Sequence, residues 1–218
     1  MGATPVPVSE DPKGSRWHAF RRDYLLPFGE AFLLAMIIRT FFLQAFTVPT
    51  GSMEPTLHGV VPGGDRIFVN KLLYGIRIPF SEKRLFKIRD PKPGDIVVFK
   101  TLGIRGVDEK KDYVKRLVAV GGQTVLIRHG HLYLDGKDSQ LHLFTQDQYY
   151  YSERDGLGYH MPFAEGRPVR VPEGTYFCLG DNSACSADGR FWGFVPQKNL
   201  LGKAMARWWP IRRIGVLK

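Results

Sequence analysis

The sequence predicts a mainly β protein, in which an N-terminal transmembrane helix precedes a domain built largely of antiparallel strands. Two observations predict this fold: an apolar stretch near the N-terminus, and a series of short β-rich runs separated by turns that contain Gly and Pro. Of the 218 residues, 44% are hydrophobic and 24% are charged, which is typical of one packed domain with a small appendage.

The first element predicted is a disordered cytoplasmic lead-in at residues 1–23, followed by a membrane anchor helix at residues 24–47. Fourteen of the eighteen residues from Ala31 to Val48 are apolar. Arg39 interrupts this stretch near its far end, where a long side chain can reach the lipid headgroups. Because Arg39, Thr40, Gln44 and Thr47 would share one side of a helix, we expect its second half to be amphipathic.

Arginines before the apolar stretch predict the orientation of the helix. Arg16, Arg21 and Arg22 precede it, whereas no Lys or Arg lies between Thr40 and Gly64. The N-terminus is therefore expected in the cytoplasm and the following domain outside it. A cleaved signal peptide and a buried core helix are the alternatives, although the apolar stretch begins late and no A-x-A-like cleavage site follows it.

The net charge of +10 is concentrated in residues 65–116 and 203–218. Such basic segments suit either nucleic acid or an anionic lipid bilayer. The sequence has no zinc-finger spacing, RNP-type aromatic signature or basic heptad pattern, so the bilayer is the expected partner and nucleic acid is not.

Residues 48–218 are predicted to form the β-rich domain, with a variable insertion or flap at residues 138–166. The β-rich runs alternate with turn formers such as Pro93-Gly94-Asp95 and Asp135-Gly136. The predicted strands are Arg66–Asn70, Asp95–Lys100, Tyr113–Val120, Thr124–Arg128, His131–Leu134, Val169–Val171, Thr175–Leu179 and Leu201–Ala206.

Ser52 is the first candidate for chemistry. It follows Gly51 and lies between two prolines in the segment PTGSMEPTL, which favours a sharp turn that exposes the serine. An ordinary turn is the simpler interpretation, because a nucleophilic serine also needs a base. Six histidines are present without a G-x-S-x-G elbow, so a Ser-His-Asp triad is not expected.

A lysine held neutral by burial is the other way to activate a serine, since loss of hydration lowers the pKa of an amine. Lys115 lies within a predicted strand whose residues are otherwise mainly apolar. Strand alternation puts Lys115 on one face with Tyr113 and Leu117, and Arg116 on the other. Because lysine can lose its proton and arginine cannot, Lys115 is the candidate base. An edge-strand lysine that reaches solvent is the alternative.

The loop GDNSACSADGRFWG at residues 180–193 is dense in turn formers. A plain surface loop is the simplest interpretation, and the acidic spacing does not match an EF-hand. The loop would also support a Ser–Lys dyad if Ser186 oriented the lysine and an Asp188–Arg190 pair braced the loop. The Ser52 N–H and the Thr50 hydroxyl are the simplest donors for an oxyanion.

Together these segments resemble the bacterial type I signal peptidases (leader peptidases), which are membrane-bound Ser–Lys serine endopeptidases. The resemblance rests on five motifs in the family's order: PTGSMEPTL, GGDRIFVNKLLYG, PGDIVVFK, DYVKRLVAVGG and VPEGTYFCLGDNSACSADGRFWGFV. It implies that Ser52 is the nucleophile, Lys115 the general base and Thr50 the oxyanion donor. It also implies that Ser186 contacts the lysine and that Asp188 and Arg190 form a structural pair. The implied substrate pocket for small residues comprises Phe46, Val48, Met53, Leu57, Tyr113 and Val114.

The function that this resemblance implies is removal of signal peptides from exported preproteins, after small residues, at the outer face of a bacterial plasma (inner) membrane. No metal or organic cofactor is implied. Departures from the family's pattern are Gly189, where Ser is common, and a less polar Ser183-Ala184-Cys185. Cys178 and Cys185 could pair outside the cytoplasm, although a strand residue such as Cys178 is typical of a buried apolar position.

Two other classes of protein remain open. A self-cleaving Ser–Lys repressor would share the dyad but should carry a helix-turn-helix, and here a hydrophobic segment closely precedes Ser52. The second is a catalytically silent, membrane-anchored binding protein.

Overall fold

The computed structural model describes residues 17–59, 63–77, 84–109, 111–128, 131–139, 141 and 166–217. It divides into two compact units, Met1–Thr40 and Phe41–Lys218. The predicted insertion at residues 138–166 lies almost wholly outside the described residues.

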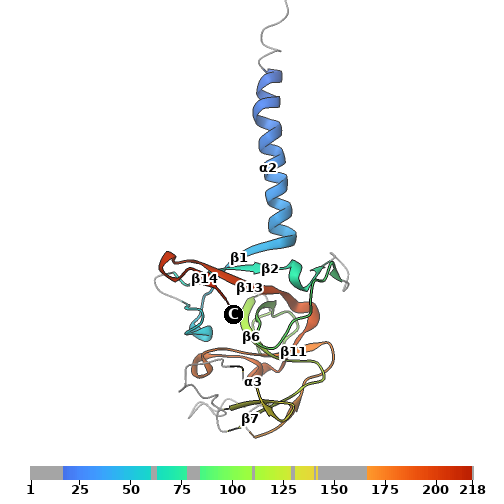
Figure 1. Cartoon of the computed structure of the whole chain (residues 1–218), viewed down its shortest axis with the longest axis vertical. Coiled ribbons are helices and arrows are strands. Elements are labelled where there is room, and N and C mark those ends of the chain that lie inside the picture. The colour runs from blue at the N-terminus through green and yellow to red at the C-terminus, as the bar shows by residue number, and fades with distance from the viewer. Residues whose placement is uncertain are drawn as a thin grey trace, which may run out of the picture. The chain divides into compact units, whose positions relative to one another are not determined.

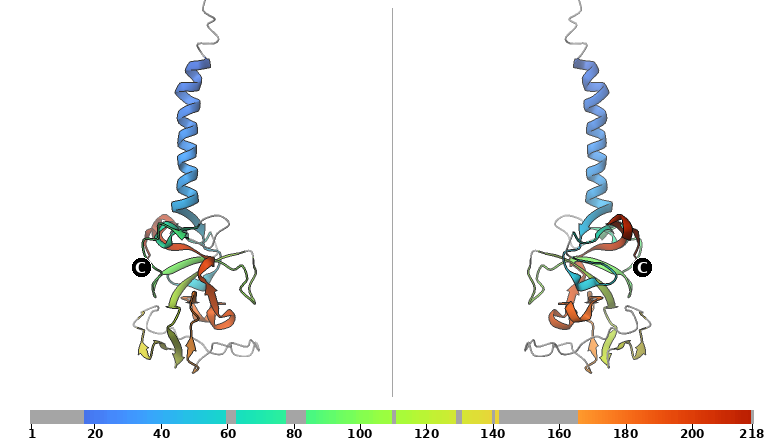
Figure 2. Two further views of the ribbon diagram at one scale, coloured as in Figure 1. Left: turned by 90° about the vertical axis from the view of Figure 1, so that its right-hand side faces the viewer. Right: turned by 90° about the vertical axis from the view of Figure 1, so that its left-hand side faces the viewer.

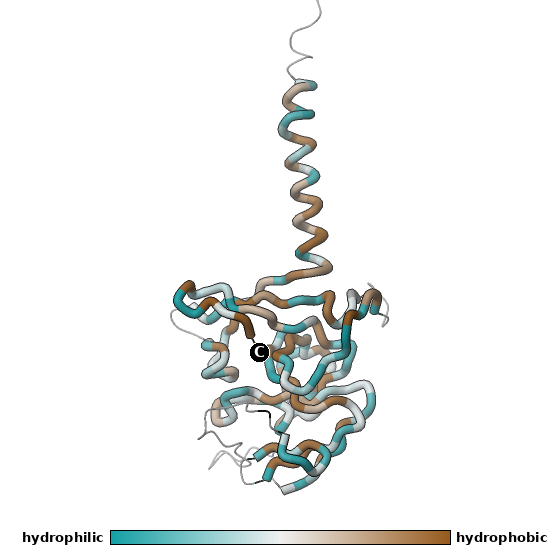
Figure 3. Tube along the Cα trace, viewed as in Figure 1, coloured by the Kyte–Doolittle hydropathy of each residue, from teal (hydrophilic) through white to brown (hydrophobic). Residues whose placement is uncertain are grey.

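A helix runs continuously from Trp17 to Phe42. Its centre is α2 (Leu26–Ile37), with π-helical turns on either side at Arg21–Leu25 and Ile38–Phe42. The first of these wide turns ends two residues before Pro27, whose missing N–H interrupts the regular hydrogen-bond ladder. By length and composition the helix can cross a hydrocarbon layer of about 30 Å. Its apolar side chains are unburied within the protein, and its C-terminal part is mostly hydrophobic (Figure 3).

The prediction of a helix over residues 24–47 is wrong at both ends. The helix begins by Trp17, within the predicted lead-in, and Leu43–Thr47 form the strand β1. Strand β1 pairs in antiparallel register with β2 (Arg66–Asn70), which satisfies its backbone groups and half-buries Phe46 against the core. The predicted amphipathic half is therefore helical only as far as Phe42, because pairing with a distant strand overrides the local pattern from Leu43 onward.

Among the described residues, eight strands form one antiparallel sheet in the order β1-β2-β13-β5-β6-β11-β12, with β14 paired to β13. Strands β1, β2 and β14 lie at one end of the β-rich unit, as Figures 1 and 2 show. The remaining strands of this sheet are β5 (Ile96–Lys100), β6 (Asp112–Val120), β11 (Thr175–Leu179), β12 (Phe194–Pro196), β13 (Leu200–Trp209) and β14 (Gly215–Val216).

Two smaller sheets and a short helix complete the described part of this unit. One sheet has the order β10-β7-β8-β9 and lies at the other end of the unit; the second pairs β3 with β4. Their bounds are β3 (Ile76–Arg77), β4 (Arg84–Leu85), β7 (Thr124–Arg128), β8 (His131–Leu134), β9 (Lys137–Asp138) and β10 (Val169–Arg170), and the helix is α3 (Gly189–Trp192). The predicted mainly β fold behind an N-terminal apolar helix is thus confirmed.

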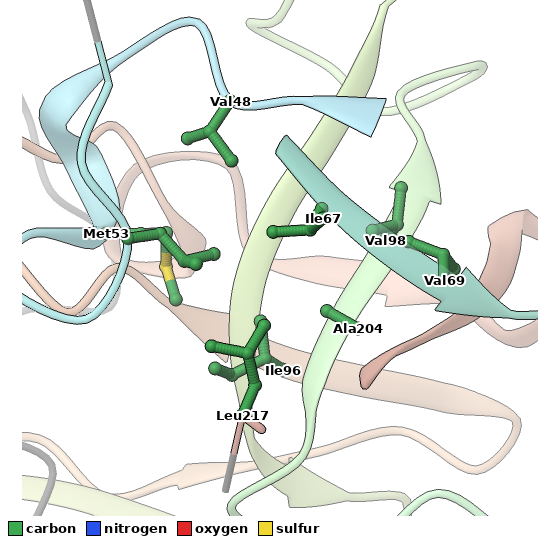
Figure 4. Packing of buried hydrophobic residues seen from close by; sticks show 9 residues of the cluster. Val48, Met53, Ile67, Val69, Ile96, Val98, Ala204 and Leu217 are labelled. Carbon is green, nitrogen blue, oxygen red and sulfur yellow. The ribbon is translucent and has the colours of Figure 1, made fainter. Parts of the chain in front are cut away.

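A buried apolar cluster fixes the segment that carries Ser52 to the large sheet. Met53 and Leu57 are fully buried there, and burial of such side chains stabilises a fold by about 1.5–3 kcal/mol each. Figure 4 shows Met53 packed among residues from several strands and the C-terminus. The cluster consists of Val48, Met53, Leu57, Ile67, Val69, Ile96, Val98, Ala204 and Leu217.

Candidate active site

Ser52 lies in a single helical turn, Gly51–Met53, that follows the extended residue Thr50. The Glu54 N–H donates to the Gly51 carbonyl at 3.1 Å, which closes the turn. The sequence predicted an exposed serine, but Ser52 is only 7% exposed. Because the neighbouring Met53 is in the core, the turn holds Ser52 at the wall of a cavity instead of on an open surface.

Lys115 comes from β6, which lies between β5 and β11 in the large sheet. It is therefore not an edge-strand lysine, and it is only 3% exposed. Its Nζ donates to Ser52 Oγ at 2.5 Å. Burial lowers the pKa of Lys115 to about 8, assisted by the Arg190 cation and opposed by the negative charges of Asp188 and Asp181. In its neutral form this amine can instead accept the Ser52 hydroxyl proton.

Thr50 adds a second hydroxyl on the open side of the serine. Its Oγ1 donates to Ser52 Oγ at 3.3 Å, and the residue is exposed. A hydroxyl in this position is within reach of an oxygen that develops negative charge next to Ser52 Oγ.

Asp188 and Arg190 form a buried ion pair that braces the loop after β11. Arg190 Nε donates to Asp188 Oδ1 at 2.9 Å and Nη2 donates to Oδ2 at 3.0 Å. The same guanidinium donates to the Ser183 carbonyl, and the Gly180 N–H donates to the Asp188 carboxylate. The pair therefore ties both ends of the loop together.

Ser186 does not make the expected hydrogen bond with the lysine. Its Oγ is buried and has no hydrogen-bond partner within the described part of the chain. The side chain packs instead against Gly180, where an added Cβ would lie 2.1 Å from Ser186 Oγ. The glycine is thus needed to make room for this hydroxyl.

Arg116, the next residue of β6, is buried as well. Its Nε and Nη2 donate to the two carboxylate oxygens of Asp181 at 2.9 and 2.6 Å. A bidentate partner compensates the guanidinium for lost hydration. Sequence reasoning missed this pair, because nothing local relates Asp181 to a strand 65 residues away.

Ser52 and Lys115 open onto a cavity of about 450 Å³. Four of the six residues expected in a substrate pocket line it, namely Val48, Met53, Tyr113 and Val114. Phe46 and Leu57 do not line it, since Phe46 packs on the apolar cluster and Leu57 is part of it. The other lining residues are Pro49, Thr50, Lys111, Asp112, Cys185 and Ala187.

Among the described residues, neither a disulfide nor a histidine contributes to this cavity, although Cys185 is one of its lining residues. Cys178 and Cys185 are free thiols, so they do not form the disulfide that was considered. Burial raises the pKa of Cys178, which suits an apolar packing role. Among the described cavity residues there is no histidine, and His129, His142 and His160 lie outside the described chain. No group of three metal-ligating side chains occurs among the described residues.

Comparison with known proteins identifies relatives of this chain. The family model for signal peptidase, peptidase S26, matches residues 21–209. A probable signal peptidase I-2 of Synechocystis sp. is 35% identical over 188 residues, covering 86% of this chain and 72% of the relative. A probable signal peptidase I-1 of the same organism is 34% identical, and the match covers 96% of this chain and 93% of the relative. The signal peptidase I of Pseudomonas aeruginosa is 32% identical, and the match covers 87% of this chain and 75% of the relative.

Proposed function

Because this chain belongs to the signal peptidase family, peptidase S26, we propose that it is a membrane-bound serine endopeptidase that removes N-terminal signal peptides from exported preproteins. One observation carries the mechanism: a buried amine, Lys115 Nζ, lies 2.5 Å from the hydroxyl oxygen of Ser52. The lowered pKa of the amine supports a neutral base near physiological pH.

In the proposed reaction, neutral Lys115 accepts the proton of Ser52 as Oγ attacks the carbonyl carbon of the scissile bond. The Thr50 hydroxyl and the Ser52 N–H stabilise the oxyanion that forms. Collapse of this intermediate breaks the C–N bond, and Lys115 returns the proton to the leaving amine. Water, activated by the same lysine, then hydrolyses the acyl-enzyme. None of these steps requires a metal or organic cofactor.

Substrate selection is proposed to depend on the cavity next to the dyad. Its walls include the side chains of Val48, Met53, Tyr113 and Val114. A mainly apolar wall close to the nucleophile suits a small uncharged residue on the acyl side of the cleaved bond.

The N-terminal helix is proposed to cross a bacterial plasma (inner) membrane once, with its N-terminus in the cytoplasm. Its length and hydropathy support a span, and Arg21 and Arg22 precede its apolar part. We also propose that the β-rich unit contacts the lipid surface through Ile211, Ile214 and Val216, which are 61–76% exposed. Arg212 lies within this exposed segment and would favour anionic lipid.

Cleavage of a model preprotein by the full chain in detergent tests the proposal. Ser52→Ala and Lys115→Ala should each lower kcat by about 10⁴-fold or more, because each removes one half of the dyad. Lys100→Ala is the matched control, since Lys100 is exposed at the end of the neighbouring strand β5. Retained cleavage in either dyad variant would refute the mechanism, and no cleavage by the unaltered chain would favour a silent binding protein.

A further inference from the structure

The backbone of the nucleophile is held by a residue that neither the dyad nor the Asp188–Arg190 pair accounts for. Asn182 Nδ2 donates to the Gly51 carbonyl at 3.1 Å, and the Asn182 N–H donates to the Ser52 carbonyl at 3.0 Å. One residue thus contacts the two successive peptide groups on either side of the Ser52 Cα. We propose that Asn182 is a positioning residue that orients the oxyanion-binding N–H of Ser52; this inference rests on the function proposed above.

The geometry of the peptide unit couples the Gly51 carbonyl to the Ser52 N–H. The Gly51 carbonyl and the Ser52 N–H belong to the same peptide group, which is planar and trans, so they point in opposite directions. A hydrogen bond that fixes the direction of the Gly51 carbonyl therefore also fixes the direction of the Ser52 N–H. The Asn182 side chain binds the oxygen end of this peptide group. It therefore does not occupy the Ser52 N–H at the other end, which can face an oxyanion.

The position of Asn182 is itself fixed by the ion pair beside it. Asp181 precedes Asn182 and is fully buried against Arg116, which follows Lys115 in β6. Two pairs of adjacent residues thus connect the strand, the loop and the nucleophile. Lys115 and Arg116 on β6 bind Ser52 and Asp181, and Asn182, next to Asp181 on the loop, binds the Ser52 backbone.

Close packing supports the same conclusion. Gly180 lies so near the nucleophile that an added Cβ would be 2.5 Å from the Ser52 carbonyl oxygen. The segment Gly180–Asn182 therefore lies directly against the Ser52 backbone. The Ser52 carbonyl, held by a backbone N–H and packed against a glycine, has little freedom to rotate. The Gly51 carbonyl accepts hydrogen bonds from the Glu54 N–H and from Asn182 Nδ2, so the Asn182 side chain adds a second restraint on the peptide plane that carries the Ser52 N–H.

The test compares Asn182→Ala and Asn182→Asp with the unaltered full chain in detergent. Both variants keep the backbone bond to Ser52, while both lose the Nδ2 donor, and aspartate adds a negative charge facing the Gly51 carbonyl. We expect kcat to fall about 10–100-fold, with the larger loss for Asn182→Asp, and KM to stay within about twofold. In Asn182→Ala the rate should rise with pH around the same midpoint as in the unaltered chain, because no charge near Lys115 changes, whereas the added carboxylate of Asn182→Asp should move the midpoint to higher pH.

Asn199→Ala is the matched control. Asn199 is a buried asparagine that donates its Nδ2 to the Leu102 carbonyl at 2.7 Å, and it does not line the cavity. Its loss should lower the thermal unfolding temperature without lowering kcat.

Several outcomes would overturn the inference. These are unchanged kcat in both Asn182 variants, a matching loss in Asn199→Ala, a rise in KM that accounts for the loss, or a shifted pH midpoint in Asn182→Ala. If Asn182→Ala fails to fold, Asn182→Asp, which preserves size, decides. Ser52→Ala is assayed alongside: cleavage by that variant refutes the proposed function itself, whereas its inactivity with fully active Asn182 variants refutes only the positioning role.

Discussion

Replacing Lys115 with methionine should abolish cleavage and at the same time stabilise the fold near neutral pH. The two effects have one cause, the burial of an amine whose charged form is disfavoured. Methionine is unbranched like the aliphatic part of lysine, is one heavy atom shorter, and carries no charge.

The magnitude follows from the pKa of the buried amine. A fall in the pKa of Lys115 from 10.5 to about 8 means that burial of the charged amine lowers the unfolding free energy by about 3 kcal/mol at pH values below 8. The unfolded chain binds more protons than the folded chain between pH 8 and 10.5, so the stability of the unaltered protein rises over that interval. The methionine variant also loses the hydrogen bond to Ser52, which offsets about 1 kcal/mol of the stability gained by removing the buried charge. We therefore expect Lys115→Met to gain about 2 kcal/mol at neutral pH and to lose that advantage near pH 10.5.

The assay is denaturant unfolding of the full chain in detergent at a series of pH values, followed by near-UV circular dichroism. The difference between variant and unaltered protein isolates Lys115, since other titrating groups are common to both. Lys100→Met, at an exposed position on β5, should show no such pH-dependent difference. The proposed role of Lys115 is refuted if Lys115→Met is less stable at neutral pH, or if the stability difference does not vary with pH. Either result would mean that burial does not lower the pKa of Lys115, which then could not act as the neutral base.

Two further outcomes are expected. Because the neutral form of Lys115 is the base, kcat/KM for acylation should rise with pH to a plateau, with its midpoint at about 8; a limb that stays flat between pH 6 and 10 would contradict this. Gly180→Ala should lower both kcat and the unfolding temperature, because the added methyl would lie 2.5 Å from the Ser52 carbonyl oxygen. Gly136→Ala is the comparison: it meets nothing within 4 Å but has a positive φ, which Gly180 lacks, so it shows the effect of backbone strain without a clash. Cleavage of the model preprotein and thermal unfolding check both Gly variants.

Local pattern was sufficient for most strands of the β-rich unit. The bounds of β2, β7, β8 and β11 agree with those predicted, since short β-branched runs between Gly and Pro turns indicate strands without knowledge of their partners. The same reasoning failed at Leu43–Thr47. There the apolar pattern continues that of the helix, and only pairing with β2 makes it a strand.

The sequence by itself determined which groups could do chemistry: a serine in a turn between prolines, and a lysine in an apolar strand. Tertiary structure alone decided that Lys115 and Ser52 meet, that Ser186 binds neither, and that Arg116 and Asn182 connect the strand to the nucleophile turn. The physical reason is that burial, and with it the pKa of an amine, depends on neighbours brought together from distant parts of the chain. Such contacts leave no periodic trace in the sequence, whereas the propensity of a strand or turn depends on adjacent residues.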